Sequence, residues 1–300
     1  MMDWNSVYLA ILAFGAAVVN GAVGYGFSSI LTPIAIFWYS NKVLNPAIVT
    51  VEVAVNLALL YRERRFIGRT WSHARPVVLT LLPGILLGTI GLTVLAVTDV
   101  KVLVYATFLP LVTLQLLGFS RPFRNEARGG AAVGPGIGFL YALTTISAPP
   151  LALFLRNQGL SKDEFRCTIA QIRVAESSMT LSTYAIFSAF FSANLLTVPS
   201  IGLLPYLFVP VLVGVPIGTL LLTRSHPEFF RRLVMAMDGL IVSFGLSRIF
   251  VTLNWLSSND GYFVMGGLFA FVGVLAWFSL KAVPMVEGPA SDRALRSDPG

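Results

Sequence analysis

The sequence predicts an all-α polytopic membrane protein made of two inverted-topology repeats. Hydrophobic residues make up 56% of the 300 residues and charged residues only 12%, about half the charged fraction of an average globular chain. Apolar runs of roughly 17–25 residues, each long enough to cross a bilayer, recur along the chain. Two apolar segments, 6–39 and 130–155, are interrupted by glycine or proline. We expect each repeat to hold one re-entrant or broken helical hairpin and three transmembrane helices, with one extra helix at the C-terminus.

The uninterrupted apolar runs define the predicted spans, which are 46–61, 76–97, 101–118, 165–191, 201–222, 230–253 and 261–280. These spans divide the chain into a first transmembrane repeat (1–118), a cytoplasmic linker (119–129), a second, inverted repeat (130–253) and an extra transmembrane helix (254–281). The last residues, 282–300, are polar and rich in proline, glycine and charge, which is typical of a disordered tail.

Arginine-rich loops predict the orientation, because short cytoplasmic loops carry an excess of Lys and Arg. The loops at 62–75, 121–128 and 224–232 are rich in arginine and are predicted to be cytoplasmic. The loops at 192–200 and 253–260 have no Lys or Arg and are predicted to face outward. We therefore expect an integral protein of the plasma (bacterial inner) membrane, with its N-terminus outside and its C-terminus in the cytoplasm.

The same rule predicts the path of the interrupted segments. The loop 156–166 is basic, so segment 130–155 must enter and leave from the cytoplasmic side, and it is too short for two full crossings. Parity then makes segment 6–39 a hairpin that enters from the outer face. Gly21, Gly24 and Gly26 would form its tip, because non-helical backbone at membrane depth is tolerated where it lines a cavity inside the protein.

The two halves also resemble each other in sequence. TPIAIFWYSN (32–41) matches PPLALFLRNQ (149–158) at an offset of 117 residues, and LPGILLGT (82–89) matches LVGVPIGT (212–219) at an offset of 130. Apolar segments align easily by chance, but the matched glycine and proline residues favour a true repeat. Inverted repeats with broken helices are typical of secondary transporters, which bind substrate where the interrupted segments meet.

These motifs resemble those of the TauE/SafE sulfite-exporter family. GAVGYGFSSILTPIAIFW, NPAIVTVEVAVNLALLYRER and LPGILLGTIG are similar to its first half, and GGAAVGPGIGFLYALTTISAPPLALFLRNQGLSKDEFRCTIAQ is similar to its second half. The resemblance runs from about residue 8 to residue 252. It implies a permease, usually an exporter, for sulfite, organosulfonates or related small anions, with a glycine-rich motif in each half lining the transport path.

The second motif departs from the family pattern that the resemblance implies. The family commonly has Gly-Ile-Gly-Gly before proline, whereas this chain has TISAPP at 145–150. Hydroxyl groups replace bare backbone there, a change that bears on which anion is bound.

The two predicted tips supply most candidate substrate-binding residues. Helix N-termini carry unpaired N–H groups and a partial positive charge, which favour anions. The candidates are Gly24, Tyr25, Gly26, Ser28, Thr144, Thr145 and Ser147. The alternative is that the hydroxyl groups only bond carbonyl groups of their own helices.

Charged residues at membrane depth are a stronger signal, because a charge near the bilayer centre costs roughly 2.5–3.5 kcal/mol and usually faces a cavity. Arg173 lies within the span 165–191, and Glu176 follows on the same helical face. We expect Arg173 to be the fixed cation for the substrate, with Gln171 as a neighbouring donor. The alternative is a structural Arg173–Glu176 pair that holds the bundle together.

Three acidic residues are candidates for proton coupling: Glu52, Glu176 and Asp238. Glu52 has a similar depth in the matching span of the first half, and its alternative role is an interfacial carboxylate. The alternative for Asp238 is a packing or capping aspartate beside Gly239.

The sequence therefore predicts a secondary transporter that exports sulfite, an organosulfonate or a similar small anion by alternating access around a midplane site between the two tips. The alternatives are an anion channel and a proton-coupled importer of a small sulfur-containing or carboxylate anion. An intramembrane enzyme is disfavoured, because His73 and His226 lie in basic loops and Asp238 has no partner aspartate within the membrane. We expect no metal ion or other cofactor.

The expected partners are the small anion and membrane lipid. The net charge of +7 lies mainly in the short loops, where it determines topology, so we expect no nucleic acid partner. The sequence indicates no oligomeric state. The spacings Gly84–Gly88 and Gly214–Gly218 predict close helix packing and no substrate contact.

Overall fold

The computed structural model describes residues 4–116, 126–156, 158–191, 194–222, 239, 243–247, 250–251, 255 and 257–281. All regular secondary structure in these residues is helical, which confirms the predicted all-α class. Most of the predicted span 230–253 and all of the predicted tail 282–300 lie outside the described residues.

The helices of the first half are α1 (Trp4–Val23), α2 (Phe27–Ala35), α3 (Asn41–Arg62), the 3-10 helix η1 (Arg64–Phe66), α4 (Ile67–Val78), α5 (Leu81–Val94) and α6 (Val97–Leu116). The predicted span 76–97 is wrong as one straight helix, because the chain bends by 48° where α4 meets α5. At the bend, the Thr80 hydroxyl donates to Pro76 O, and the Thr80 N–H bonds instead to Val77 O. The side chain thus takes the carbonyl that the regular helical bond would use.

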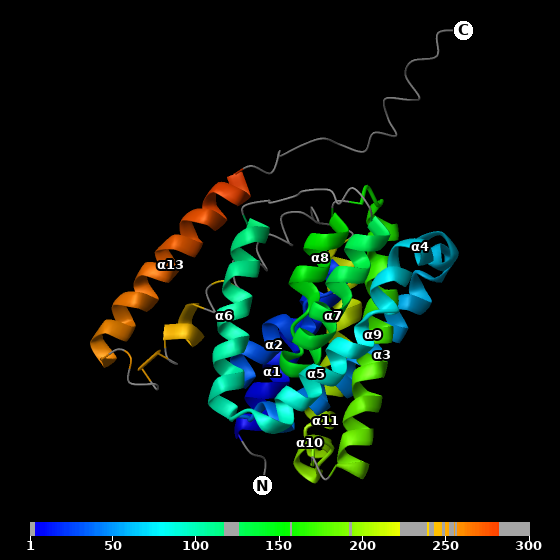
Figure 1. Cartoon of the computed structure of the whole chain (residues 1–300). Helices are drawn as coiled ribbons and strands as arrows, with labels where there is room; N and C mark the ends of the chain where they lie inside the picture. Colours follow the sequence, from blue (N-terminus) through cyan, green and yellow to red (C-terminus); the bar gives the residue numbers. More distant parts are fainter. Residues whose placement is uncertain are drawn as a thin grey trace, which may run out of the picture.

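The helices of the second half are α7 (Glu126–Thr144), α8 (Ala148–Arg156), α9 (Lys162–Phe190), α10 (Val198–Gly202) and α11 (Leu204–Leu222), and α13 (Ser258–Lys281) follows them. Figure 1 shows α13 at the edge of the molecule, on the side of α6. α9 begins with a capping box: the Ser161 hydroxyl accepts the Glu164 N–H, and the Glu164 carboxylate accepts the Ser161 N–H. Reciprocal bonds of this kind stop the first turn from fraying.

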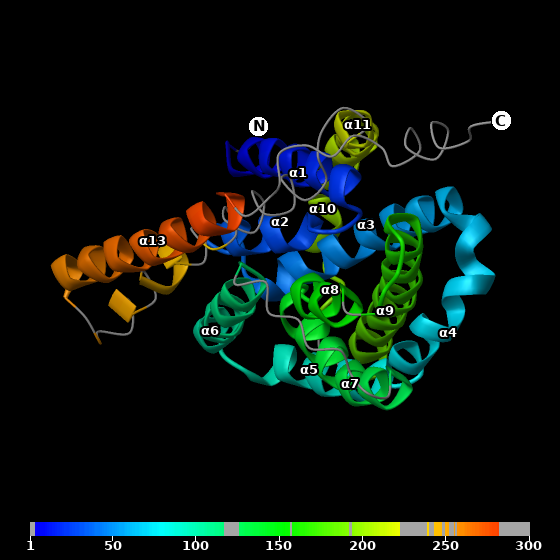
Figure 2. The same cartoon turned by 90° about the horizontal axis from the view of Figure 1, so that it is seen from above.

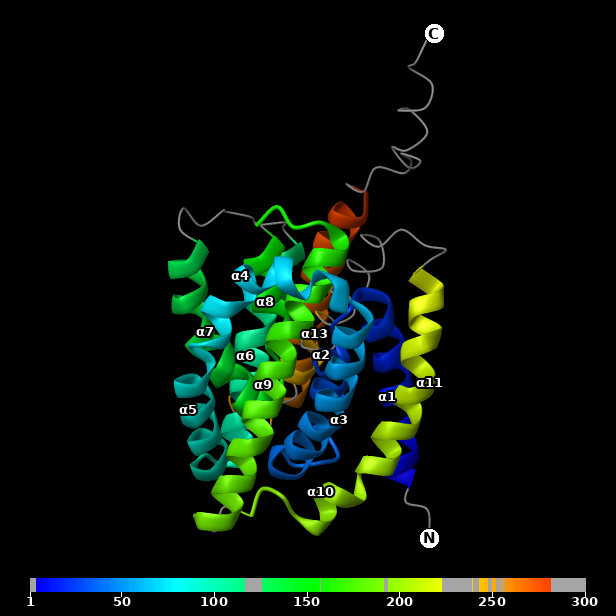
Figure 3. The ribbon, with the colours of Figure 1, turned by 90° about the vertical axis from the view of Figure 1, so that its right-hand side faces the viewer.

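Figure 3 shows α4 and α10 at opposite ends of the molecule, which we name the α4 end and the α10 end. α1 and α3 both begin near the α10 end, so the chain returns to that end after the break between α1 and α2. α7 begins and α8 ends near the α4 end. The two broken helix pairs therefore enter the bundle from opposite ends.

Two close helix crossings flank the centre of the bundle. Figure 2 shows α1 beside α11 on one side and α5 beside α7 on the other, with α2, α3, α8 and α9 between them. A Cβ atom added to Gly218 would lie 1.8 Å from Val18 O, and one added to Gly84 would lie 1.8 Å from Pro135 O. Backbones this close require glycine, which confirms the packing role predicted for these spacings.

The contacts at the two crossings repeat, with one fixed shift in residue number between α5 and α11 and another between α1 and α7. Gly84 meets Pro135 on α7, whereas Gly214 meets Phe14 on α1. Gly214 follows Gly84 by 130 residues, as the sequence match predicts, but Pro135 follows Phe14 by 121. The short helices α2 and α8 are also 121 residues apart. The sequence match at 117 is therefore displaced by about one helical turn from the structural correspondence.

Large apolar side chains cover the outside of the bundle. Within the described part of the chain, Trp4–Val23, Asn41–Arg62 and Val198–Leu221 are each long and apolar enough to cross a membrane. Ile11, Leu87 and Leu212 lie on the outer surface with most of their area exposed. An exposed apolar surface of this kind suits contact with lipid chains.

Candidate functional site

The two helix breaks share one backbone conformation. Gly24 has a φ of +92° and Thr145 a φ of +62°, in the left-handed region that favours glycine. The N–H of each of these residues bonds a carbonyl four residues earlier, at Asn20 and at Tyr141 respectively. Gly26, with a φ of +110°, adds a second left-handed residue to the first break. The second break has the same turn built on a threonine.

The breaks lie past the middle of the bundle and do not meet there. A Cβ added to Gly24 would lie 3.3 Å from the side chain of Arg166, which is in the second turn of α9 at the α4 end. At the other break, Asn45 Nδ2 donates to Leu143 O at 2.8 Å, and Asn45 is in the second turn of α3 at the α10 end. The two hairpins therefore overlap, and the centre of the bundle lies between their breaks.

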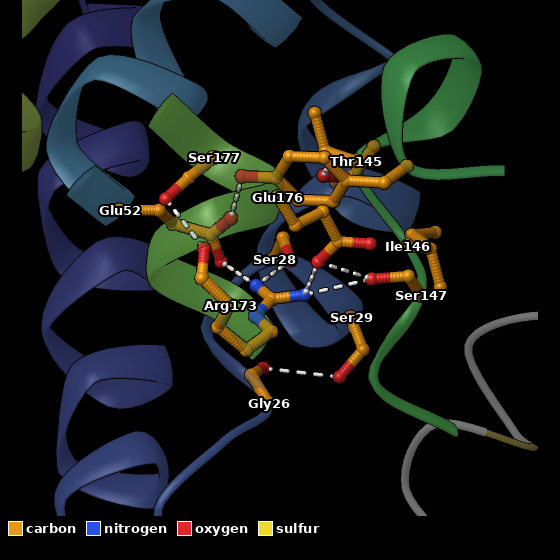
Figure 4. Close-up of polar contacts among 12 residues, drawn as sticks. Gly26, Ser28, Ser29, Glu52, Thr145, Ile146, Ser147, Arg173, Glu176 and Ser177 are labelled. Carbon is orange, nitrogen blue, oxygen red and sulfur yellow. Dashed lines mark hydrogen bonds and ion pairs between the residues drawn. The ribbon is translucent and has the colours of Figure 1, made fainter. Parts of the chain in front are cut away.

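A buried arginine occupies this centre. Figure 4 shows the Arg173 guanidinium surrounded by polar side chains from both halves of the chain. Its Nη2 donates to Glu52 Oε1 at 2.5 Å and to Ser28 Oγ at 3.4 Å. Its Nη1 donates to Ser147 Oγ at 2.9 Å and to Glu176 Oε2 at 3.4 Å.

Further bonds orient the carboxylates around Arg173. The Tyr141 hydroxyl donates to Glu52 Oε2 at 2.6 Å, and the Tyr141 ring centroid lies 5.0 Å from the Arg173 guanidinium carbon. The Ser147 hydroxyl donates to Glu176 Oε2 at 2.9 Å. Glu176 Oε1 has no hydrogen-bond partner among the described residues. We name these five residues, Arg173, Glu52, Glu176, Tyr141 and Ser147, the central cluster.

The central cluster contains more acid than base. Arg173 is 3% exposed, Glu52 1% and Glu176 0%, and charges at such depth need partners. One guanidinium faces two carboxylates, so the ionised cluster has one unit of excess negative charge. The Arg173–Glu176 pair exists, but as the longer of two ion pairs. The Glu52 side chain is buried in the middle of α3, which favours a role inside the bundle over the interfacial alternative.

The other predicted site residues divide into three groups. Ser28 and Ser147 contact Arg173, as described above. Thr145 Oγ1 lies 2.6 Å from Thr32 Oγ1, and Thr144 Oγ1 donates to Leu140 O in its own helix, which is the alternative predicted for such hydroxyls. Gln171 does not contact Arg173 but donates to Ile67 O at 2.9 Å, because residues two apart lie on different helix faces.

One predicted residue lies away from the central cluster, and one lies outside the described residues. Tyr25 is at the first break, where its ring packs edge-on against Phe165 at 6.5 Å between centroids. Asp238 lies outside the described residues, so its role stays a prediction. Sequence reasoning missed Tyr141, which lies four residues before Thr145. The structural offset of 121 would have indicated it, since Tyr141 corresponds to the buried Asn20 of the first break.

The helices that follow the breaks differ in the donors they present. α2 begins at Phe27 after Gly26, and no described side chain caps it. α8 begins at Ala148, followed by Pro149 and Pro150, which have no N–H. The predicted cluster of helix N-terminal donors is therefore much weaker at the second break.

The family model for the sulfite exporter TauE/SafE family matches residues 9–244. The chain belongs to this family. No curated protein and no solved structure matches the chain. Members of the TauE/SafE family are membrane transporters of the sulfite or sulfonate exporter type, so the chain is an integral membrane protein of that general type.

The TauE/SafE match covers both breaks and every residue of the central cluster. The glycine motif that the resemblance assigns to the first half of the family is kept at Gly24 and Gly26. At the second break Thr145 and Ser147 replace the expected glycines. These hydroxyls are engaged, Thr145 with α2 and Ser147 with the central cluster.

Proposed function

We propose that this TauE/SafE protein is a secondary transporter that exports sulfite, an organosulfonate or a similar small anion, with Arg173 as its substrate cation. The observation that carries the proposal is the position of Arg173 between the two breaks, in contact with Ser28 of one hairpin and Ser147 of the other. A guanidinium presents donors in a planar fork that fits two oxygens of a sulfite or sulfonate group.

An incoming anion must compete with the carboxylates. Both terminal nitrogens of Arg173 already donate to acidic side chains, Nη2 to Glu52 and Nη1 to Glu176. A sulfonate oxygen would replace one carboxylate oxygen, and the 3.4 Å bond to Glu176 is weaker than the 2.5 Å bond to Glu52. We therefore propose that substrate displaces Glu176 first, while Glu52 and Tyr141 keep the guanidinium in position.

We also propose that the two halves are inverted repeats with a site accessible alternately from the two ends. The constant shift of 121 residues between corresponding contacts supports this arrangement, as does the opposite direction of the two hairpins in Figure 3. At that shift Glu52 corresponds to Arg173, so the central ion pair joins equivalent positions across a pseudo-two-fold axis. With every member of the cluster buried, the described conformation suits an occluded state.

Voltage would favour export in the proposed orientation, with the α4 end and its arginines in the cytoplasm. Each negative charge that leaves a cell gains about 2.3 kcal/mol per 100 mV of inside-negative potential. Export of sulfite would thus need no coupling ion.

A second candidate, proton-coupled transport, is favoured by the two carboxylates of the central cluster. Once an anion binds Arg173, the ionised cluster and substrate together have at least two units of excess negative charge. Glu176 Oε1, which lacks a partner among the described residues, could accept a proton that offsets part of this charge. Uptake against the membrane potential would require such a proton.

The deciding experiment is flux into proteoliposomes with a panel of sulfite, thiosulfate, sulfonates and carboxylates. We expect saturable flux of at least one sulfur oxyanion and its loss in Arg173→Ala. The matched control is Arg69→Ala, which removes an exposed arginine that pairs with Glu164 at 3.4 Å. Unchanged affinity and rate in Arg173→Ala would exclude Arg173 as the substrate site, and flux that never saturates would favour a channel.

A charge-balanced variant guards against misfolding. Arg173→Ala leaves two buried carboxylates without their cation, which can itself destabilise a protein by about 3–5 kcal/mol. The double variant Arg173→Gln/Glu52→Gln removes one charge of each sign, and it should fold yet lack saturable flux. Flux that depends on voltage but not on a pH gradient would support uniport, whereas strict dependence on the pH gradient would favour the proton-coupled candidate.

A further inference from the structure

A second buried arginine lies at the first break, outside the central cluster. Arg166 is 8% exposed, and its Nη2 has no hydrogen-bond partner in the described part of the chain. Its nearest acid is Glu63, whose Oε1 lies 3.9 Å from Arg166 Nε, at the outer limit of an ion pair. A buried, charged donor without an acceptor is unfavourable, so this nitrogen is suited to a ligand that supplies one.

The backbone of the first break passes next to Arg166 and leads into the start of α2. A Cβ on Gly24 would lie 3.3 Å from both Cγ and Nε of Arg166, so the backbone of the break passes close to the guanidinium stem. Two residues later, Gly26 is the N-cap of α2, whose first turn has no side-chain cap among the described residues. Uncapped N–H groups at the start of a helix attract anions.

Arg166 and Arg173 lie on one face of the same helix. They are seven residues apart on α9, about two turns or 10.5 Å along the axis at 1.5 Å per residue. Arg166 is nearer the α4 end, and Arg173 is at the centre of the bundle. The buried side chains of Ile169 and Ala170 lie between them on this face, three and four residues after Arg166.

We propose that Arg166 and the first break form a second anion-binding site, which receives a small oxyanion from the α4 end before it passes to Arg173. This inference rests on the proposed function. Glu63 acts there as a competing carboxylate, which an arriving anion displaces from Arg166. A cationic site in a low-dielectric pocket raises the local concentration of anions at that side of the bundle.

The corresponding position at the other end is neutral. At the offset of 121 residues, Arg166 corresponds to Asn45, which donates to Leu143 O beside the second break. Asn45 Oδ1 has no partner among the described residues, but an amide attracts anions far less than a guanidinium does. The site therefore gives the protein a higher affinity for anions at its α4 end than at its α10 end.

The test is sulfite flux measured from each side of proteoliposomes whose protein has one verified orientation. We expect Arg166→Gln to raise the KM from the α4 side about tenfold, as for the loss of one charge-assisted contact, and to leave the KM from the α10 side unchanged. The maximal rate from the α10 side should fall in parallel, because passive transport requires equal Vmax/KM in both directions.

A second variant separates a ligand site from a structural ion pair. Glu63→Gln removes the competing carboxylate, so it should lower the KM from the α4 side, opposite to the effect of Arg166→Gln. A purely structural pair predicts instead that both variants impair the protein in the same direction, and that result would overturn the proposal. The double variant Arg166→Gln/Glu63→Gln keeps the charge balance, and its KM from the α4 side should match that of Arg166→Gln. Arg69→Gln serves as the surface control.

The outcomes distinguish this inference from the proposed function. Equal changes of KM on both sides, or none, in Arg166→Gln would exclude the second site while leaving Arg173 as the transport site. If wild-type protein transports no sulfite, thermal stabilisation by sulfite still tests the site. Stabilisation that persists in Arg173→Gln but is lost in Arg166→Gln would support it, and absence of stabilisation in wild-type protein would overturn it.

Discussion

The helix crossings of the two halves are alike, whereas the helix breaks differ in chemistry. A Cβ on Gly84 would lie 1.8 Å from Pro135 O and one on its counterpart Gly214 would lie 2.9 Å from Phe14 O. A Cβ on Gly88 would lie 2.5 Å from Phe139 O and one on its counterpart Gly218 would lie 1.8 Å from Val18 O, so all four contacts are too close for a side chain. The first break is built on glycine at Gly24, and the second on Thr145. Close backbone packing needs only the absence of a side chain, so glycine can serve the same purpose at both crossings. In the proposed function the breaks flank a binding site, so their chemistry need not be the same.

The central ion pair shows why the chemistry must differ between the halves. Glu52 and Arg173 are 121 residues apart and contact each other at 2.5 Å. Two equivalent positions that touch across a pseudo-two-fold axis would repel if both were arginine or both glutamate. Opposite residue types turn that repulsion into attraction. If the halves are inverted repeats as proposed, charged side chains at this contact must therefore be of opposite sign.

The largest expected effect is at the crossings. Gly84→Ala and Gly218→Ala would each place a methyl group 1.8 Å from a backbone carbonyl oxygen, so the two packed helices must move apart. We expect each substitution to lower the free energy of unfolding by roughly 3 kcal/mol or more. The yield of monodisperse protein and the unfolding midpoint in denaturant would measure the loss.

The matched controls are glycines on the same helices that face open space. A Cβ on Gly15 of α1 or Gly136 of α7 would have no described atom within 4 Å. Gly15→Ala and Gly136→Ala should be neutral or stabilising, by up to about 1 kcal/mol, since alanine favours helix. Equal losses of unfolding free energy in all four variants would refute the claim that the helices at the crossings are too close for any residue but glycine.

A smaller effect is expected from removing one hydroxyl of the central cluster. Tyr141→Phe leaves the buried carboxylate of Glu52 without the 2.6 Å bond from the tyrosine. Tyr105→Phe is the control, because the Tyr105 hydroxyl donates at 2.6 Å to a neutral acceptor, Pro33 O. We expect a loss of about 2 kcal/mol for the first and about 1 kcal/mol for the second. Equal losses would contradict the claim that the Tyr141 hydroxyl bond is the stronger because it is made to a buried carboxylate.

Much of the fold could be predicted from the sequence, because apolar length, arginine position and glycine spacing act locally. The exact register of the repeat could not, since leucine-rich and valine-rich segments match almost as well when displaced by one helical turn. The bend at Thr80 also escaped prediction, because a threonine hydroxyl in a helix gives no distinct signal in sequence.

The candidate site was predictable only in part. Arg173 and Glu176 are recognisable because charges are rare at membrane depth. The contact between Arg173 and Glu52 joins two distant helices, and periodicity carries no information about such contacts. Gln171 was expected beside Arg173 because it is close in sequence, but residues two apart lie on different helix faces, and Gln171 bonds Ile67 O instead.

The breaks themselves provide the next comparison. Gly24→Ala adds a Cβ to a residue with a φ of +92°, and we expect a loss of about 1–2 kcal/mol. Thr145→Gly relieves a strained φ but loses the 2.6 Å contact with Thr32 and adds freedom to the unfolded chain, so its net effect should stay under about 1 kcal/mol. Thermal unfolding of the two variants side by side measures the difference, and a larger loss for Thr145→Gly would show that side-chain bonds determine the second break.

The smallest expected effect compares the starts of α3 and α9. Ser40 and Ser161, 121 residues apart, are the N-caps, but only the Ser161 hydroxyl accepts a bond from its helix in the described structure. Ser161→Ala should destabilise the protein by about 1 kcal/mol and Ser40→Ala hardly at all. Hydrogen bonds with Ser161 lower the pKa of the Glu164 carboxyl. The stabilisation that the ionised Glu164 carboxylate provides is therefore complete at neutral pH, and it is lost as the pH falls through that lowered pKa. The difference in unfolding midpoint between Ser161→Ala and the wild type should therefore narrow across this acidic range, down to the part that comes from the bond between the Glu164 N–H and the Ser161 hydroxyl, which does not titrate. A constant difference at all pH values would show that the ionisation of Glu164 does not contribute to the cap.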